Sequence, residues 1–281
     1  MTPVEITMIM FASMLILMLM GLPITFCLGS VGVLATIMLW NTRALNVVYF
    51  SLMGVSGSIV LTAVPLFIFM GFMFHYSGVA SDMFDTIYKW AGGVNGALGA
   101  GTVLIWAIMA AMIGISGPTV LSLGVLVVPA MIARGYDKKL AMGTVMSGGA
   151  LGFLIPPSLM MIMFGFLGDV SVGKLFAAGI IPGFMLAGIY IVYIMVRCFL
   201  RPQDGPALPL ELRASWTEKF IALRYLLCPT LLIAILLSAI FTGTASPTEA
   251  AGLGAGLSMV VAMLHKRFSL KVLNQTCRHA M

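Results

Sequence analysis

Long apolar segments, separated by short polar or glycine- and proline-containing joints, fill most of the chain. Residues 4–20 and 24–40 are the first two such segments, and a Gly-Leu-Pro joint at 21–23 divides them. Each is close to the ~20 apolar residues that a helix needs to cross a bilayer. The pattern recurs in the segments 60–77, 97–113, 120–132, 140–154, 159–167, 175–199, 225–241 and 247–264. It predicts an all-α, polytopic helical membrane protein.

Three segments depart from this pattern and carry more polar residues. Residues 44–58 contain glycines and serines, which predicts a helix lying partly in the membrane interface before the span at 60–77. Residues 79–91 have two aspartates and a lysine on one side, as a short amphipathic surface helix does. Residues 200–224 are polar and contain three prolines, so we expect the longest water-exposed connection there.

The stretch from residue 114 to residue 158 interrupts its apolar segments twice. The first interruption, at 116–119, predicts either a re-entrant hairpin over 97–133 or two short spans. The second, at 147–149 followed by 154–158, predicts a break inside one helix over 140–167. The backbone groups freed by such breaks are costly in lipid unless they line a cavity and bind something. We therefore predict the binding site of a membrane transporter in this stretch.

The first interruption has the residue types of an ion or anion site. Ser116 is placed to cap a helix that starts at Gly117 and Pro118, since proline suits the first helical turn. The N-terminus of that helix would favour a carboxylate. The hydroxyls of Ser116 and Thr119, with carbonyls from the preceding helix end, could ligate a small hard cation. A plain turn between two spans explains the same residues equally well.

The second interruption favours a binding site over a loop between two short segments. Pro156 and Pro157 remove two backbone donors and free earlier carbonyls, and Gly149 permits a close approach of the backbone. The apolar segments on either side are each too short to cross a membrane comfortably. Ser158 adds a hydroxyl, so the candidate sodium ligands are Ser116, Thr119 and Ser158.

Composition supports a membrane protein and argues against an enzyme. The 281-residue chain is 61% hydrophobic and 9% charged, whereas a soluble domain carries about 25% charged residues. Its nine acidic residues fall near predicted span ends or in loops, so no mid-span carboxylate is available as a proton relay. A sodium site built from carbonyls and hydroxyls fits better. The four cysteines and three histidines form no pattern typical of a metal centre or a disulfide framework, and we predict no cofactor.

The basic residues predict the orientation of the chain in the membrane. If the turn 134–139 is cytoplasmic, counting crossings places 13 of the 15 lysines and arginines on the cytoplasmic side, with Arg43 and Lys174 as the exceptions. This asymmetry follows the positive-inside rule, and it puts the N-terminus outside if residues 44–77 cross the membrane only once. It also explains the net charge of +6 without nucleic acid.

Two helix pairs predict an inverted repeat. The pair 4–40 and the pair 225–264 have joints on opposite sides of the membrane by the same count, which is typical of inverted-topology transporters. The predicted regions are scaffold helices and an interfacial helix of the first repeat over 1–91, a transport region over 92–199, a cytoplasmic loop over 200–224 and the start of the second inverted repeat over 225–281.

The sequence resembles the large membrane subunit of tripartite ATP-independent periplasmic (TRAP) transporters. The matching segments are GISGPT at 114–119, PAMIARGYD at 129–137, GGALGFLIPPS at 148–158, GKLFAAGIIPG at 173–183 and SPTEAA at 246–251. The resemblance implies an elevator-type, sodium-driven importer in a bacterial inner membrane. It also implies a small membrane subunit and a periplasmic substrate-binding protein as partners, and an organic acid as the substrate. In that family the hairpin tip and the unwound proline region carry sodium and substrate contacts, which correspond here to Ser116, Gly117, Pro118, Thr119, Gly149, Pro156, Pro157 and Ser158.

The resemblance also implies a second hairpin and a second broken helix beyond Met281. The chain is therefore expected to be C-terminally truncated relative to that family, with an incomplete second repeat. Two alternatives to the importer stay open. One is another inverted-repeat anion–sodium symporter that needs no binding protein, and the other is a truncated membrane scaffold that transports nothing.

Overall fold

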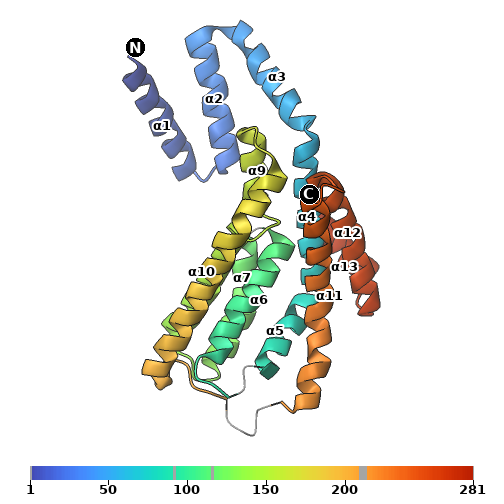
Figure 1. Ribbon diagram of the computed structural model, residues 1–281. Helices are drawn as coiled ribbons and strands as arrows, with labels where there is room; N and C mark the ends of the chain where they lie inside the picture. Colours follow the sequence, from blue (N-terminus) through green and yellow to red (C-terminus); the bar gives the residue numbers. More distant parts are fainter. Residues whose placement is uncertain (1, 91–92, 115–116, 209–213, 281) are drawn as a thin grey trace. The chain divides into compact units, whose positions relative to one another are not determined.

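A computed structural model describes residues 2–90, 93–114, 117–208 and 214–280, and all regular elements in these ranges are helices (Figure 1). The predicted all-α class is confirmed. The chain divides into two compact units, residues 1–58 and residues 59–281.

The first unit consists of a helical hairpin and a shorter helix. Its elements are α1 (Pro3–Leu19), α2 (Ile24–Trp40), the 3-10 turn η1 (Thr42–Ala44) and α3 (Leu45–Ser56). Helix α1 begins with a capping box, in which the Glu5 amide donates to the Thr2 hydroxyl and the Thr2 amide donates to the Glu5 carboxylate. Gly21, with φ of +85°, turns the chain between α1 and α2, a conformation that glycine adopts without strain.

The second unit contains the remaining helices. They are α4 (Ile59–Tyr76), α5 (Val79–Trp90), α6 (Ala97–Ile113), α7 (Gly117–Ile132), α8 (Lys138–Ala150), η2 (Leu151–Phe153), α9 (Leu159–Leu167), α10 (Val172–Leu200), η3 (Pro202–Asp204), α11 (Trp216–Phe241), α12 (Pro247–Leu264) and α13 (Leu270–Ala280). The helices α6, α7, α8 and α10 form one bundle, and α4 packs against α12 and α13 (Figure 1). The core joins these groups through buried side chains such as Phe67, Met70, Met109 and Phe176.

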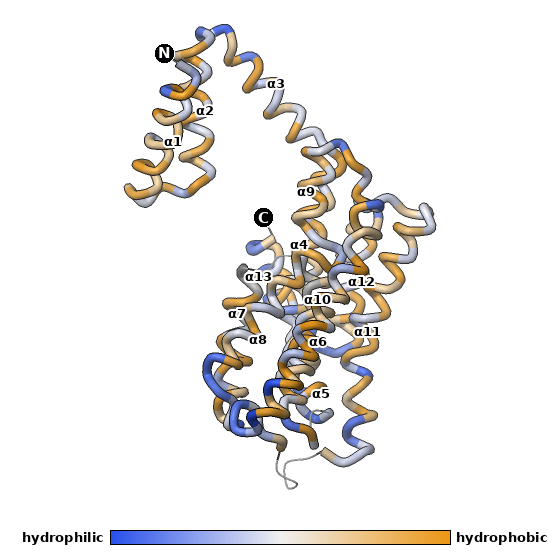
Figure 2. Tube along the Cα trace, turned by 60° about the vertical axis from the view of Figure 1, so that its left-hand side comes forward, coloured by the Kyte–Doolittle hydropathy of each residue, from blue (hydrophilic) through white to orange (hydrophobic). Residues whose placement is uncertain are grey.

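Four helices in the described ranges are long and apolar enough to cross a membrane. They are α4, α10, α11 and α12, and α1, α2 and the first part of α6 are shorter apolar helices. Hydrophobic residues dominate these helices, whereas hydrophilic residues gather at the end of the second unit that carries the turn between α7 and α8 (Figure 2). The chain is a multi-pass membrane protein.

Helix α5 is amphipathic, as the pattern of 79–91 predicts, and its apolar side is buried on α6 and α11. The Thr86 hydroxyl donates to the Ala222 carbonyl over 3.0 Å, and the Trp90 indole donates to the Lys219 carbonyl over 3.0 Å. These bonds attach α5 to the first turns of α11.

The polar connection predicted over 200–224 is shorter than expected. Residues 216–224 are helical, because Ser215 and Glu218 form a capping box that starts α11 nine residues earlier. The connection is also partly covered by protein, since the Ala207 amide donates to the Asn95 side chain over 2.9 Å and Gly205 is buried. The connection before α11 is therefore shorter than predicted, and residues 209–213 lie outside the described residues.

The order of elements matches the predicted repeat. Helices α1, α2 and α3 have 17, 17 and 12 residues, and α11, α12 and α13 have 26, 18 and 11 residues. In both sets, two apolar helices form a hairpin and a shorter helix follows. Both α1 and α11 begin with a capping box. The inverted orientation of the two sets stays a prediction.

Candidate functional site

The stretch 97–133, predicted to form a re-entrant hairpin or two short spans, contains the helices α6 and α7. Their re-entrant placement stays a prediction. Gly114 is buried and has φ of +64°, the left-handed region in which a side chain is strained. Helix α7 begins at Gly117, so Pro118 stands in its first turn as expected. Ser116 lies outside the described residues, and so do the side chains of Pro118 and Thr119.

The helix predicted to be broken is broken. Helix α8 ends at Ala150, a 3-10 turn covers Leu151–Phe153, and α9 starts only at Leu159. Since Pro156 and Pro157 have no amide hydrogen, a continuing helix could not pair the carbonyls four residues earlier. The chain therefore leaves the helix for five residues, 154–158, between η2 and α9.

The hairpin tip and the broken helix meet. The Leu159 amide donates to the Gly114 carbonyl over 3.3 Å. A Cβ atom on Gly114 would lie 2.9 Å from the Pro157 carbonyl oxygen, closer than side-chain carbons ordinarily come. Gly114 therefore brings the backbone just after α6 against the proline break between η2 and α9.

Ser158 stands between Pro157 and Leu159, the two residues that contact Gly114, and its side chain is fully buried. It precedes α9 but its side chain makes no capping bond. Instead its hydroxyl donates to the Phe153 carbonyl over 2.9 Å, one of the two carbonyls that the prolines leave without a helical partner. A hydroxyl oxygen that donates its proton keeps acceptor lone pairs, so Ser158 retains the chemistry of a cation ligand.

Helix α10 covers the other side of the break through two glycines that sequence reasoning did not single out as site residues. A Cβ atom on Gly179 would lie 2.6 Å from the Leu154 carbonyl oxygen, and one on Gly183 would lie 2.8 Å from the Ile155 side chain. Small residues four apart let helix backbones approach closely in membrane proteins. That spacing in 179–183 is the signal that could have identified them.

The glycines at 148 and 149 do not interrupt the helix, which corrects the start predicted for the second break. Both are buried within α8. A Cβ atom on Gly148 would lie 2.6 Å from the Trp106 ring of α6, so this glycine serves the close packing of α6 on α8. The break begins after Ala150, and Gly149 lies in the last helical turn before it.

An open groove of about 940 Å³ lies elsewhere, along α10, and a smaller cavity of about 130 Å³ adjoins the break. Ile155 and Pro156 line the smaller cavity together with apolar side chains of α6, α10 and α11. Its one hydroxyl belongs to Thr230, which donates it to the Leu226 carbonyl. The cavity therefore offers little to a charged ligand, and the polar side of the break is the one that faces the hairpin tip.

The opposite end of the bundle is held by a polar cluster. Asp137 caps α8 by accepting from the Lys139 and Leu140 amides, each over 3.1 Å, and Arg197 lies 3.6 Å from the same carboxylate. Arg197 also donates to the Asp204 carboxylate over 2.9 Å. These bonds join the turn after α7, the start of α8 and the end of α10, so the hairpin and the broken helix share a common base.

Tyr136 completes this base from inside the bundle. Its side chain is buried, and its hydroxyl accepts from the Gly99 amide at the start of α6 over 3.4 Å. Burial raises the pKa of Tyr136 to about 12, because the phenolate would lose its hydration. The residue stays neutral at physiological pH.

The described ranges contain no group of three or more His, Cys, Asp and Glu side chains that could hold a metal ion. Among the described residues, the oxygen atoms at the meeting point are backbone carbonyls and the Ser158 hydroxyl. Oxygen donors of this kind suit a hard cation such as sodium better than a transition metal. Of the predicted site residues, the structure brings Pro157 and Ser158 to the hairpin tip, places Gly149 one turn before the break, and leaves the contribution of Ser116 and Thr119 as a prediction.

Comparison with known proteins identifies similar sequences over nearly the whole chain. Residues 11–281 match the family model described as "Tripartite ATP-independent periplasmic transporter, DctM component". The chain is 35% identical over 236 residues to the C4-dicarboxylate TRAP transporter large permease protein DctM of Pseudomonas aeruginosa, which covers 84% of this chain and 54% of that protein. It is 31% identical over 280 residues to the protein of the same name from Rhodobacter capsulatus, covering 94% of this chain and 62% of that protein.

More distant matches carry other substrate names. The sialic acid TRAP transporter permease protein SiaT of Haemophilus influenzae is 30% identical over 273 residues, which are 95% of this chain and 42% of that protein. The ectoine TRAP transporter large permease protein TeaC of Halomonas elongata is 30% identical over 246 residues, 87% of this chain and 56% of that protein. The chain thus spans about half the length of the curated relatives it matches.

Proposed function

The chain belongs to the family of the DctM component of tripartite ATP-independent periplasmic transporters, and from this premise we propose that it serves as the membrane-embedded permease subunit of a sodium-coupled importer of small organic acids. The region 92–199 is the proposed transport region, and the helices before and after it are the proposed scaffold. Members of the family are transport permeases, so the chain is not an enzyme.

The meeting of Gly114 with Leu159 is the observation that carries this proposal. It supports a site in which the helix break, its freed carbonyls and the buried Ser158 hydroxyl adjoin Gly114, three residues before α7 begins. Carbonyl and hydroxyl oxygens suit a sodium ion, and a helix N-terminus favours a carboxylate. One site can therefore hold both the coupling ion and an anionic substrate, with Ser116, Thr119 and Ser158 as proposed sodium ligands.

The proposed partners are a small membrane subunit and a periplasmic substrate-binding protein, and the proposed location is a bacterial inner membrane. Family membership supports both, because the family is defined by a tripartite, periplasmic system. Dicarboxylates, ectoine and sialic acid, the compounds named for the relatives, all carry a carboxylate. A small organic acid is the substrate class common to them.

Uptake into proteoliposomes tests the proposal. The chain, reconstituted with its small membrane subunit and its binding protein, is expected to take up labelled succinate only when sodium is higher outside. A matched preparation with potassium in place of sodium is the control. Uptake that is equal in both, or that needs no binding protein, would favour a different symporter. An absence of uptake in every arm would leave the membrane-scaffold alternative in place.

A further inference from the structure

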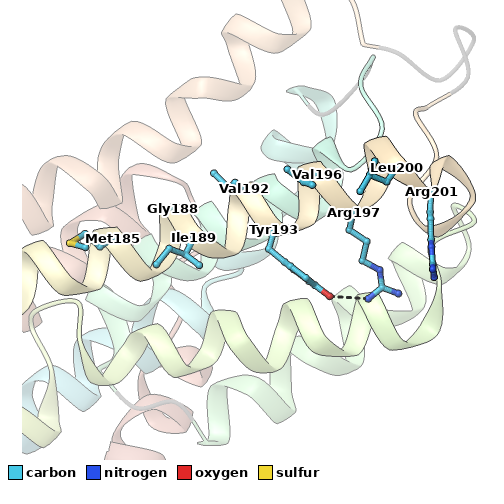
Figure 3. A pocket seen from close by; sticks show the side chains of 9 residues that line it. All are labelled: Met185, Gly188, Ile189, Val192, Tyr193, Val196, Arg197, Leu200 and Arg201. Atoms are coloured by element: carbon cyan, nitrogen blue, oxygen red, sulfur yellow. Dashed lines mark hydrogen bonds between the residues drawn. The ribbon is translucent and has the colours of Figure 1, made fainter.

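An open groove runs along the second half of α10, far along the chain from the proline break. Nine residues line it, and all belong to α10 or to the position just after it (Figure 3): Met185, Gly188, Ile189, Val192, Tyr193, Val196, Arg197, Leu200 and Arg201. Its volume is about 940 Å³. A second hollow of about 440 Å³, between α8 and α10, shares Ile189, Tyr193 and Arg197 with it. The two form one continuous surface, which we call the α10 groove.

The α10 groove is apolar along most of its length and basic at one end. From Met185 to Val196 the large lining side chains other than Tyr193 are aliphatic, and all of them are about half exposed or more. Tyr193, Arg197 and Arg201 then follow at intervals of four residues, which places them on one helix face. Figure 3 shows Tyr193 and Arg197 pointing to the same side of α10, with the tyrosine hydroxyl hydrogen-bonded to the guanidinium.

The length of the apolar part matches one leaflet of a membrane. The 11 steps from Met185 to Val196 rise about 16 Å in an α-helix. Half of the hydrocarbon core of a bilayer is about 15 Å. An acyl chain lying in the groove therefore reaches the headgroup level where Arg197 and Arg201 stand.

The charges at that end are not balanced. Arg197 is held by Asp137 and Asp204. Arg201 and Lys139, the other cations lining the two hollows, take part in no ion pair within the described part of the chain. The Tyr193 hydroxyl accepts from Arg197 and keeps its own proton to donate. Three donors, two of them positively charged, thus face whatever occupies the headgroup end.

We propose that the α10 groove binds a glycerophospholipid with an anionic headgroup. The acyl chains lie along the aliphatic part, and the phosphate accepts from Arg201, Lys139 and Tyr193. Basic pockets between membrane helices recognise anionic headgroups in this way. None of its lining residues belongs to the hairpin tip or the break, so it does not overlap the proposed substrate site.

Lipid retention by the purified chain tests this proposal. The full chain in a neutral detergent is incubated with equal amounts of phosphatidylglycerol and phosphatidylcholine that carry the same acyl chains, and bound lipid is counted by native mass spectrometry. We expect phosphatidylglycerol to be retained in preference. The variant Arg201→Gln should reduce that preference about fivefold, the effect of one interfacial charge.

A second variant tests the apolar part. A Cβ atom on Gly188 meets no atom within 4 Å, so Gly188→Leu fills the groove without disturbing the protein, and both lipids should be lost. Two matched controls should behave like the wild type. Lys174→Gln removes an exposed charge at the opposite end of α10, and Gly252→Leu adds the same side chain at an exposed glycine of α12 that is equally free of neighbours.

Three results would overturn the proposal. One is equal retention of the two lipids by the wild-type chain. The other is a lipid count that Arg201→Gln and Gly188→Leu leave unchanged. A dimer of the chain that Gly188→Leu dissociates would also count against it, because the groove would then be covered by protein.

Discussion

The amide of Leu159 donates to the carbonyl of Gly114 over 3.3 Å, and this bond joins the tip of a helical hairpin to a helix broken by two prolines. Neither partner would make the bond in regular structure. An uninterrupted helix would direct the Leu159 amide to its own chain, and only a residue tolerant of φ at +64° can present its carbonyl in this position. The contact is therefore specific to the two interruptions.

Replacing Gly114 with alanine should weaken this junction. Left-handed backbone costs a non-glycine residue about 1–2 kcal/mol, and the added carbon would overlap the Pro157 carbonyl, 2.9 Å away. Thermal unfolding in detergent should show the loss, together with reduced sodium-dependent uptake. Gly143→Ala is the control, because its Cβ atom meets nothing within 4 Å in α8. A Gly114→Ala protein as stable as Gly143→Ala would contradict the geometry.

Replacing Ser158 with alanine should raise the sodium concentration needed for half-maximal uptake. The change removes a proposed ligand and the hydrogen bond from the Ser158 hydroxyl to the Phe153 carbonyl, a loss of about 1 kcal/mol. Ser116→Ala is expected to act in the same direction. Ser147→Ala serves as the control, since its hydroxyl donates only within α8, to the Thr144 carbonyl. Unchanged sodium activation in both Ser116→Ala and Ser158→Ala would reject the proposed ligands.

The base of the bundle should depend on Asp204. Its carboxylate accepts from Arg197 over 2.9 Å and its side chain is 15% exposed. Asp204→Asn should lower the free energy of unfolding by about 1 kcal/mol, since partly exposed ion pairs contribute little more. A double-mutant cycle with Arg197→Gln isolates the pair. Additive effects of the two substitutions would show that the pair contributes no stability of its own.

The stability of the folded protein should fall as the pH rises above 10, because of Tyr136. The pKa of this residue is about 12 in the folded protein, against 10.0 as the ordinary value. Protonated Tyr136 contributes its full share of the free energy of unfolding below pH 10. That share is lost as the pH rises toward 12, because the tyrosine of the unfolded chain releases its proton first. The expected loss is on the order of 2 kcal/mol. The melting temperature should fall more steeply across this pH range for the wild type than for Tyr136→Phe. Parallel curves for the two proteins would contradict this role of Tyr136.

Orientation can be measured by cysteine labelling. Lys138 is exposed and lies in the turn that the basic residues predict to be cytoplasmic, whereas the exposed Lys174 lies near the other end of the bundle. With the native cysteines replaced, Lys138→Cys should react only with a reagent that crosses the membrane, and Lys174→Cys should also react with one that does not. The reverse pattern would overturn the predicted topology.

Local signals in the sequence were sufficient for most of the helices and for both breaks. Proline and glycine act on their own chain segment, so Pro156 and Pro157 reveal an interruption wherever the segment lies. One helix boundary was misplaced although a local signal was present. The start of α11 at Trp216 could have been predicted, because Ser215 and Glu218 have the spacing of a capping box.

Other features depend on partners that lie far away in the sequence. Gly148 remains helical because its lack of a side chain makes room for Trp106, a neighbour on another helix. The bond from Leu159 to Gly114 likewise has no local pattern that would predict it. The sequence could therefore indicate which segments are irregular, but their assembly into one place became visible only in three dimensions.

The bond from the Ser158 hydroxyl to the Phe153 carbonyl has a consequence for the order of events at the site. While the Ser158 hydroxyl donates its proton to the Phe153 carbonyl, only its oxygen lone pairs face a ligand. Lone pairs repel a carboxylate and attract a cation. A cation that arrives first would turn the same surface from repulsive to attractive for the anion that follows. In the proposed site, this side chain would therefore favour a binding sequence in which the ion precedes the acid.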